Sequence, residues 1–273
     1  MNLLQSLLYG IVSGFTEFLP ISSQGHQIFL KKVFGVSVSE PLRDLLIHIA
    51  LLLAIIMCSG TYLVKIRREM KTFRSNNGRR VDKRVVYDFR LIRTAIYPMI
   101  AVLLLCNLII DLSNSMAMLA LLWAINGVVL YIPEHLPNGN KDSGKMSTFD
   151  GILLGLVCGI SVIPGLSRIG TGISLTTARG AAKTKAYNWI LIISIPVLIF
   201  LMIIDFIALI SGGFGTINFM SILGYLISSV SAFATAVAGI YLMRFLTVRA
   251  SLSPFGFYCW GAALLSFILY LMT

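Results

Sequence analysis

Charged residues are scarce in this chain. They make up 12% of its 273 residues, whereas hydrophobic residues make up 57% and the mean hydropathy is +0.88. A soluble domain carries roughly 25% charged residues, and several uninterrupted apolar runs here are long enough to cross about 30 Å of hydrocarbon. The composition excludes an ordinary soluble domain and predicts an all-α polytopic protein of the cell membrane.

Cysteine is also rare. The four cysteines stand in four different apolar segments and show no metal-ligand spacing. This distribution is typical of small buried hydrophobes, indicates no cysteine metal site and gives no reason to pair the cysteines. The chain opens with an apolar segment that has neither a basic n-region nor a small-residue cleavage site, so we expect no secretory signal peptide.

Positive charge is concentrated in one segment. Residues 65–93 hold eleven Lys and Arg and three acidic residues, which leaves +8 of the net +11. In a membrane protein such a segment indicates the cytoplasmic side, and contact with anionic lipid headgroups is a secondary interpretation. Because there is no soluble domain to carry it, we expect no nucleic-acid partner.

Hydropathy predicts six membrane-spanning helices, at residues 45–64, 92–110, 116–132, 187–210, 219–244 and 253–272. Two further apolar stretches, 3–30 and 151–178, are interrupted near the middle by proline and small polar residues. Proline removes a backbone donor and clashes with the preceding helical turn. Broken backbone is tolerated at membrane depth only where it is buried in protein or lines a wet cavity, so both stretches are predicted to be re-entrant helical hairpins.

The positive charges support this topology. A re-entrant 151–178 keeps the basic cluster that follows it (Arg179, Lys183, Lys185) on the cytoplasmic side, whereas a spanning segment would place it outside. Only Lys31 and Lys32, on the outer side of the first hairpin, count against the assignment.

The chain then divides into two repeats of opposite orientation within one membrane domain, residues 1–135 and 136–273. Each repeat is a re-entrant hairpin followed by three helices. Pro20 and Pro164 lie 144 positions apart, and the same offset relates Ser23 to Ser167. Inverted repeats with broken helices place a site near the middle of the membrane. The first hairpin enters from the outer face, so the pocket is predicted to open outward.

Polar residues collect at the two interruptions. The first contains Glu17, Ser22, Ser23 and His26, and the second contains Gly165, Ser167, Arg168 and Thr171. Arginine binds phosphate oxygens in a bidentate manner, and glycines and serines at a helix start offer N–H and O–H donors to an anion. Glutamate and histidine supply an acid, a base, or a metal-assisted pair. The set predicts a pocket for a phosphorylated headgroup whose apolar tail stays in the bilayer.

A structural interpretation stays open for most of these residues. Glu17 and Arg168 would pair as a bridge, and His26 and the serines would satisfy backbone groups at a broken helix. A purely structural role is least expected for Arg168, because burying a guanidinium at membrane depth is energetically costly.

Two motifs carry a family resemblance: Thr16-Glu17-Phe18-Leu19-Pro20-x-Ser22-Ser23-x-Gly25-His26 and Pro164-Gly165-x-Ser167-Arg168. Together with the helix from Leu45 and the closing Ser253-Pro254-Phe255 helix, they resemble the undecaprenyl-pyrophosphate phosphatase family of the bacitracin-resistance type over nearly the whole chain. The resemblance implies release of the terminal phosphate of a polyprenyl pyrophosphate, which regenerates the monophosphate carrier for cell-wall glycan export. It further implies catalytic roles for Glu17 and His26, pyrophosphate binding by Arg168, and assistance by the matched serines.

The chain departs from the family pattern at three positions. Ser13 stands where the family has a second glutamate, Ile169 replaces a serine after the arginine, and His48 replaces a glutamine. Carboxylates at i and i+4 share a helix face and would bind a divalent cation together. We therefore expect Mg²⁺ or Ca²⁺ at Glu17 to be held weakly, with Ser13 and His48 as accessory residues.

Three functions follow from this pattern. The first is a working pyrophosphatase in which Arg168 clamps the substrate and His26 acts as base or nucleophile, directly or through Ser23. The second is a transporter that moves a polyprenyl phosphate or related anion through the same pocket. The third is a catalytically silent paralogue. The expected partners are the polyprenyl pyrophosphate lipid, the bilayer and a second copy of the chain in a homodimer.

Overall fold

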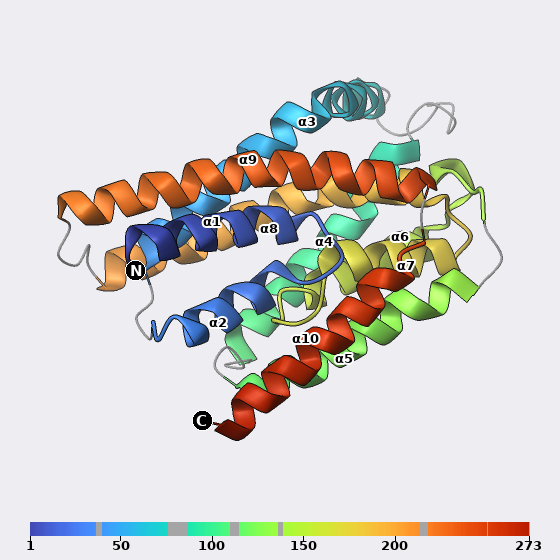
Figure 1. Cartoon of the computed structure of the whole chain (residues 1–273). Helices are drawn as coiled ribbons and strands as arrows, with labels where there is room; N and C mark the ends of the chain where they lie inside the picture. The colour runs from blue at the N-terminus through green and yellow to red at the C-terminus, as the bar shows by residue number, and fades with distance from the viewer. Residues whose placement is uncertain are drawn as a thin grey trace.

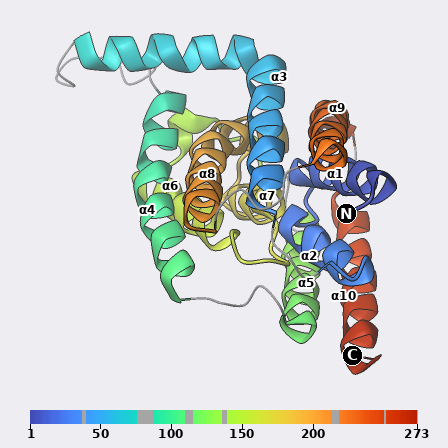
Figure 2. The ribbon, with the colours of Figure 1, turned by 90° about the vertical axis from the view of Figure 1, so that its left-hand side faces the viewer.

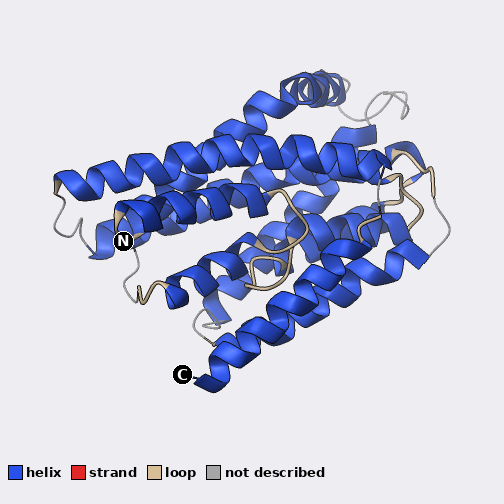
Figure 3. Ribbon diagram, viewed as in Figure 1, coloured by secondary structure: helices blue, strands red, loops and turns tan. Residues whose placement is uncertain are grey.

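The computed structural model describes residues 1–36, 40–75, 87–109, 115–135, 139–212, 218–249 and 251–272. Within these ranges the chain is helical with short loops and contains no strand, only an isolated bridge between Lys141 and Ala181 (Figure 3). Residues 76–86 of the basic segment, residue 110 at the end of one predicted helix and residue 136 at the predicted repeat boundary lie outside the described residues.

Six described helices are long and apolar enough to span a membrane. They are α3 (Pro41–Ser75), α4 (Tyr87–Ile109), α5 (Met116–Tyr131), α8 (Lys183–Gly212), α9 (Phe219–Arg249) and α10 (Ser253–Met272). Five of them agree with the predicted spans to within five residues at each end. The sixth, α3, contains the predicted span 45–64 and continues well past residue 64. The all-α polytopic class is confirmed.

Helix α3 is longer than predicted because it continues after its apolar part ends. At Ser59 the backbone leaves helical geometry (φ −115°, ψ 15°), and the helix then turns and crosses over α4 (Figure 2). This basic arm, residues 60–75, is fixed to the start of α4: Phe89 N–H donates to Glu69 at 2.8 Å, and Lys65 pairs with Asp88. Hydropathy marks the end of the span, not the end of the helix.

The two interrupted stretches form helical hairpins, α1–α2 (Leu3–Glu17, Ser23–Val33) and α6–α7 (Thr148–Ile160, Arg168–Ala178). The longest of these helices has 15 residues, or about 22 Å, which is shorter than a hydrocarbon core of about 30 Å. The hairpins come from opposite ends of the bundle and their tips meet near its middle (Figure 1).

The helix contacts follow a reciprocal pattern. Helix α1 packs on α9 and α6 packs on α4, while α3 packs on α8 and α5 on α10. If the two repeats correspond, exchanging them turns the α1–α9 pair into the α6–α4 pair and leaves the α3–α8 and α5–α10 pairs unchanged, as an internal two-fold axis requires. The contacts support the predicted inverted repeats, and the division at residues 135 and 136 stays a prediction.

Glycines let the first helix of each hairpin approach its neighbour closely. A Cβ on Gly14 would lie 2.1 Å from the Ala232 carbonyl oxygen of α9, and one on Gly155 would lie 2.1 Å from the Ala95 carbonyl oxygen of α4. Small residues allow this backbone contact between helices in a membrane. The two hairpins are therefore fixed to the bundle by equivalent contacts.

Candidate functional site

The tip of the first hairpin is held by Ser22. This residue caps α2 and has φ 69°, a left-handed conformation that few residues other than glycine adopt. Its Oγ accepts hydrogen bonds from Gly25 N–H at 3.3 Å and from Gly165 N–H at 2.9 Å. The second bond joins the two hairpin tips directly.

The second tip is built in a similar way. Gly165 has φ 101°, and a Cβ there would lie 2.6 Å from the Leu122 side chain. Ser167 caps α7: its Oγ accepts from Gly170 N–H at 3.1 Å and donates to the Leu19 carbonyl at 3.2 Å. Thr171 donates to the Ser167 carbonyl at 2.7 Å. Gly165 and Thr171 thus shape the tip.

Helix α5 satisfies the backbone groups that the broken helices leave unpaired. Trp123 Nε1–H donates to the Ile21 carbonyl, and the Asn126 amide donates to the Pro20 carbonyl, both at 3.0 Å. The same amide accepts from Ser167 N–H at 2.9 Å. Buried backbone groups need such partners, and sequence reasoning did not find these two side chains.

A buried ion pair crosses the junction. Arg168, at the first turn of α7, pairs with Glu17 at the end of α1, and its Nε–H donates to Ser194 of α8 at 2.9 Å. Both charged side chains are at most 10% exposed. The bridge between them was one of the sequence-based interpretations, and it is present.

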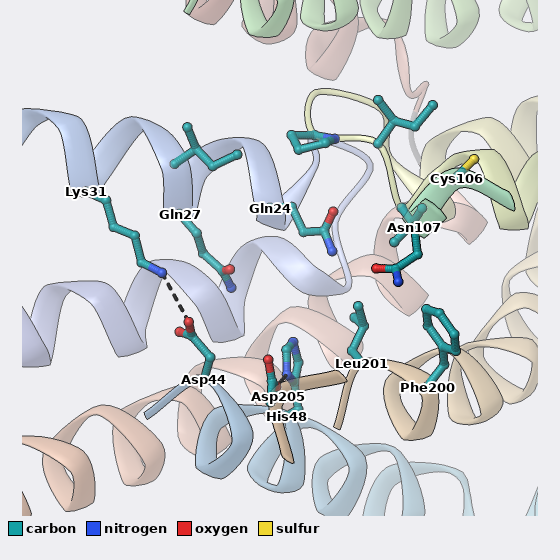
Figure 4. Close-up of a pocket in the computed structure, with 14 residues that line it drawn as sticks. Gln24, Gln27, Lys31, Asp44, His48, Cys106, Asn107, Phe200, Leu201 and Asp205 are labelled. Carbon is teal, nitrogen blue, oxygen red and sulfur yellow. Dashed lines mark hydrogen bonds and ion pairs between the residues drawn. The ribbon is translucent and has the colours of Figure 1, made fainter. Parts of the chain in front are cut away.

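Two adjoining cavities lie at this junction. The smaller is lined by polar groups from both hairpins and α3, namely Glu17, Ser22, Ser23, Ser167, Arg168 and His48. The larger, of about 290 Å³, shares Gln24, Gln27 and His48 with it and also has Lys31, Asp44 and Asp205 in its wall (Figure 4). The polar and apolar lining suits an anionic headgroup that carries a hydrocarbon chain.

Four predicted site residues do not line these cavities: Ser13, His26, Gly165 and Thr171. Ser13 is fully buried, its carbonyl accepts from Ser23 Oγ at 3.2 Å, and its own Oγ has no partner among the described residues. Position 13 is therefore filled by a small side chain packed behind the first tip, outside both cavities.

His26 faces away from the pocket. Its Nδ1 lies 2.7 Å from the Ser22 carbonyl oxygen, and its Nε2 lies 2.7 Å from the hydroxyl of Tyr258 on α10. The two rings stack with centroids 5.7 Å apart. Both ring nitrogens are engaged, and the structure does not bring this histidine to Glu17 and Arg168.

Protein ligands for a cation are few among the described residues. They contain no group of three or more His, Cys, Asp or Glu placed to hold a metal ion. The single predicted carboxylate ligand, Glu17, already pairs with a guanidinium. The described residues therefore supply no all-protein cage for Mg²⁺ or Ca²⁺. A cation would depend on Glu17 together with oxygens of the bound substrate, and we assign no chemical step to one.

Asp205 and Lys31 are lining residues that sequence reasoning missed. On α8, Val197, Leu201 and Asp205 are spaced four apart and line the same side. Asp44 of α3 accepts from Lys31 Nζ at 3.1 Å. The available signal was a carboxylate in an otherwise apolar helix, which indicates function by default.

The fold and this junction define a polytopic membrane protein with a charged binding pocket between two broken-helix hairpins. The chain belongs to the bacitracin resistance protein BacA family, whose model matches residues 6–265. The family predicted from the two motifs is confirmed.

Curated relatives span the same length. The undecaprenyl-diphosphatase 1 of Shouchella clausii (strain KSM-K16) is 30% identical over 98% of this chain and 96% of its own. The undecaprenyl-diphosphatases of Halothermothrix orenii and Methanobrevibacter smithii are 25% and 26% identical, each over 98% of both chains. The similarity therefore covers both hairpins and all six long helices.

Proposed function

We propose that this protein is an integral membrane phosphatase that hydrolyses undecaprenyl pyrophosphate to the lipid monophosphate and inorganic phosphate. The observation that carries the proposal is the placement of Arg168 at a helix start, in a cavity that both hairpins line. Membership of the family and the names of the relatives support the same activity. They do not favour the transporter or the silent paralogue.

Phosphate binding follows from the two tips. Arg168 offers a charge-assisted donor, and the N-termini of α2 and α7 point their positive dipole ends at the junction. The hydroxyls of Ser22, Ser23 and Ser167 stand around the same space. An incoming pyrophosphate would share the guanidinium with Glu17, whose carboxylate holds the arginine in place until substrate arrives.

The larger cavity accommodates the start of the prenyl chain. Its wall contains apolar side chains from the hairpins and α8, namely Ile28, Val162, Ile163, Phe200 and Leu201. With the headgroup bound at Arg168, the prenyl chain would therefore run between α2 and α8 toward the lipid. This arrangement favours a polyprenyl pyrophosphate over a free pyrophosphate ion.

We further propose that the pocket opens to the outer face. Its wall includes residues from the start of α3 and from the end of α4. The basic arm is the last part of α3 and contacts the start of α4, so it lies on the other side of the bundle (Figure 2). By the positive-inside rule the arm is cytoplasmic. The released phosphate would then leave on the outer side of the membrane.

The test is phosphate release from a C15 or C55 prenyl pyrophosphate by the purified protein in detergent, with Mg²⁺, with Ca²⁺ and with EDTA. Turnover establishes the activity, and loss of turnover in EDTA would establish the predicted cation requirement. Absence of turnover with every cation would contradict the proposed function.

A further inference from the structure

A second histidine faces the pocket that His26 does not reach. His48 of α3 lines both cavities, and its Nδ1 lies 2.6 Å from Oδ2 of Asp205 on α8. The pair bridges two helices that meet beside Arg168 and Glu17. In Figure 4 the imidazole and the Asp205 carboxylate lie together on one wall of the larger cavity.

The contact fixes which nitrogen of His48 is available. A carboxylate only accepts, so the Nδ1–H of the neutral ring donates to Asp205 and Nε2 keeps its lone pair. Among the described residues, no side chain or backbone group hydrogen-bonds this Nε2. The imidazole is thus oriented by a carboxylate on one side and open on the other, which is the arrangement of a general base.

We propose that His48 is the catalytic base of pyrophosphate hydrolysis in this chain and that Asp205 positions it. The inference rests on the proposed function. Nε2 of His48 takes one proton from a water molecule as the water oxygen forms a bond to the terminal phosphorus. The bond from that phosphorus to the bridging oxygen breaks, and its electron pair leaves with the lipid monophosphate. The terminal group departs as inorganic phosphate, and His48 then returns its proton to solvent or product.

The neighbouring charges agree with this role. Glu17 and Arg168 lie in the smaller cavity with His48, so a phosphate bound by the arginine is beside the imidazole. The other charged pair on the wall, Lys31 with Asp44, is mutually neutralised at 3.1 Å. Asp205 therefore stays free to hold His48.

The experiment measures kcat and KM for C15 prenyl pyrophosphate in four variants: His48→Gln, Asp205→Asn, the double variant and His48→Gly. We expect His48→Gln to lower kcat by about 100-fold or more, the usual range for loss of a general base, with KM within about threefold of the wild-type value. Asp205→Asn should lower kcat by about 10- to 100-fold, because the amide no longer selects the tautomer. The double variant should be no slower than His48→Gln, since residues that act as a unit are not additive.

Rescue separates chemistry from structure. Added imidazole should restore part of the turnover of His48→Gly and none of Asp205→Asn, whereas a purely structural bridge would give no rescue. His135 provides a matched control, because it is exposed and, among the described residues, its Nδ1 contacts only the carbonyl of Tyr131, four residues earlier in the chain. His135→Gln should keep the wild-type kcat.

The comparison with His26→Gln decides between the two histidines. Full turnover in His48→Gln, with turnover lost in His26→Gln, would overturn the proposal and leave the phosphatase intact. A wild-type protein that releases no phosphate would overturn the proposed function and the base together.

Discussion

The two hairpins share a frame and differ in charge. In each, a short helix ends, the backbone breaks near a proline, and a second helix starts at a serine cap, Ser22 in the first hairpin and Ser167 in the second. The first hairpin contributes the carboxylate of Glu17 to the junction, and the second contributes the guanidinium of Arg168. The two tips thus have similar backbone structures but contribute side chains of opposite charge.

The serine caps indicate a second possible offset between the two predicted repeats. The prolines lie 144 positions apart and align Ser23 with Ser167, whereas the capping roles align Ser22 with Ser167 at an offset of 145. By function, Ser23 corresponds to Arg168 as the first helical residue. Matching backbone positions therefore carry a hydroxyl in the first hairpin and a guanidinium in the second, and a guanidinium is the stronger donor to a phosphate.

The largest expected effect concerns the opposite entry of the two hairpins. Cys106 of α4 lines the larger cavity, and Cys58 lines a different cavity beside the kink of α3, where the basic arm begins. In intact cells, a membrane-impermeant maleimide should label Cys106 and leave Cys58 unlabelled, and inverted vesicles should reverse the result. Cys158 and Cys259 are buried and serve as controls that label only after denaturation. Labelling of Cys58 from outside would contradict the proposed orientation.

A smaller effect is expected where the hairpins contact the bundle. Gly14→Ala and Gly155→Ala each force a Cβ to within 2.1 Å of a carbonyl oxygen, so both should destabilise the protein by about 1–3 kcal/mol, as overpacking does. Thermal unfolding in detergent measures this. Gly261→Ala is the control, because nothing lies within 4 Å of its Cβ position. Equal losses of stability in the two variants would support equivalent packing of the two hairpins. An unfolding midpoint of Gly155→Ala equal to that of the wild type would contradict this equivalence.

The serine caps should differ from each other by about 1–2 kcal/mol in their contribution to stability. Ser167→Ala removes a helix cap, which costs about 1 kcal/mol. It also removes the bond from Ser167 Oγ to the Leu19 carbonyl, an acceptor with a second lone pair. Ser22→Ala should cost more, about 2–3 kcal/mol, because it leaves the buried Gly165 N–H without its acceptor. Ser22→Gly should recover part of that loss, since glycine adopts the positive φ without strain. Identical stabilities for the two alanine variants would show that Ser22 is an ordinary cap.

Much of the architecture could be predicted from sequence, because each strong signal there is local. Hydropathy located six spans, and proline with small polar residues located both breaks. The extension of α3 could not be predicted, since a polar helix on a surface has no hydropathy signal. The partners that complete the tips, such as Asn126 and Trp123, lie more than 100 residues away along the chain, and no local pattern marks them.

The site was predicted in part for the same reason. Glu17 and Arg168 were identified because charge in an apolar segment is conspicuous, and they lie together as expected. The orientation of His26 depends on Tyr258 in the last helix, and the partner of His48 lies on α8. Side-chain direction at a broken helix follows from tertiary contacts, which a motif does not contain.

The most direct test of the account is turnover in Arg168 variants. We predict that wild-type protein releases phosphate from C55 prenyl pyrophosphate, that Arg168→Lys is about 100-fold slower, and that Arg168→Ala is slower still, because a donor that stabilises the transition state is lost. Unfolding midpoints of the variants control for the loss of the Glu17 pair. Wild-type turnover in a folded Arg168→Ala protein would place hydrolysis elsewhere and contradict the claim that the junction of the two hairpins is the active site.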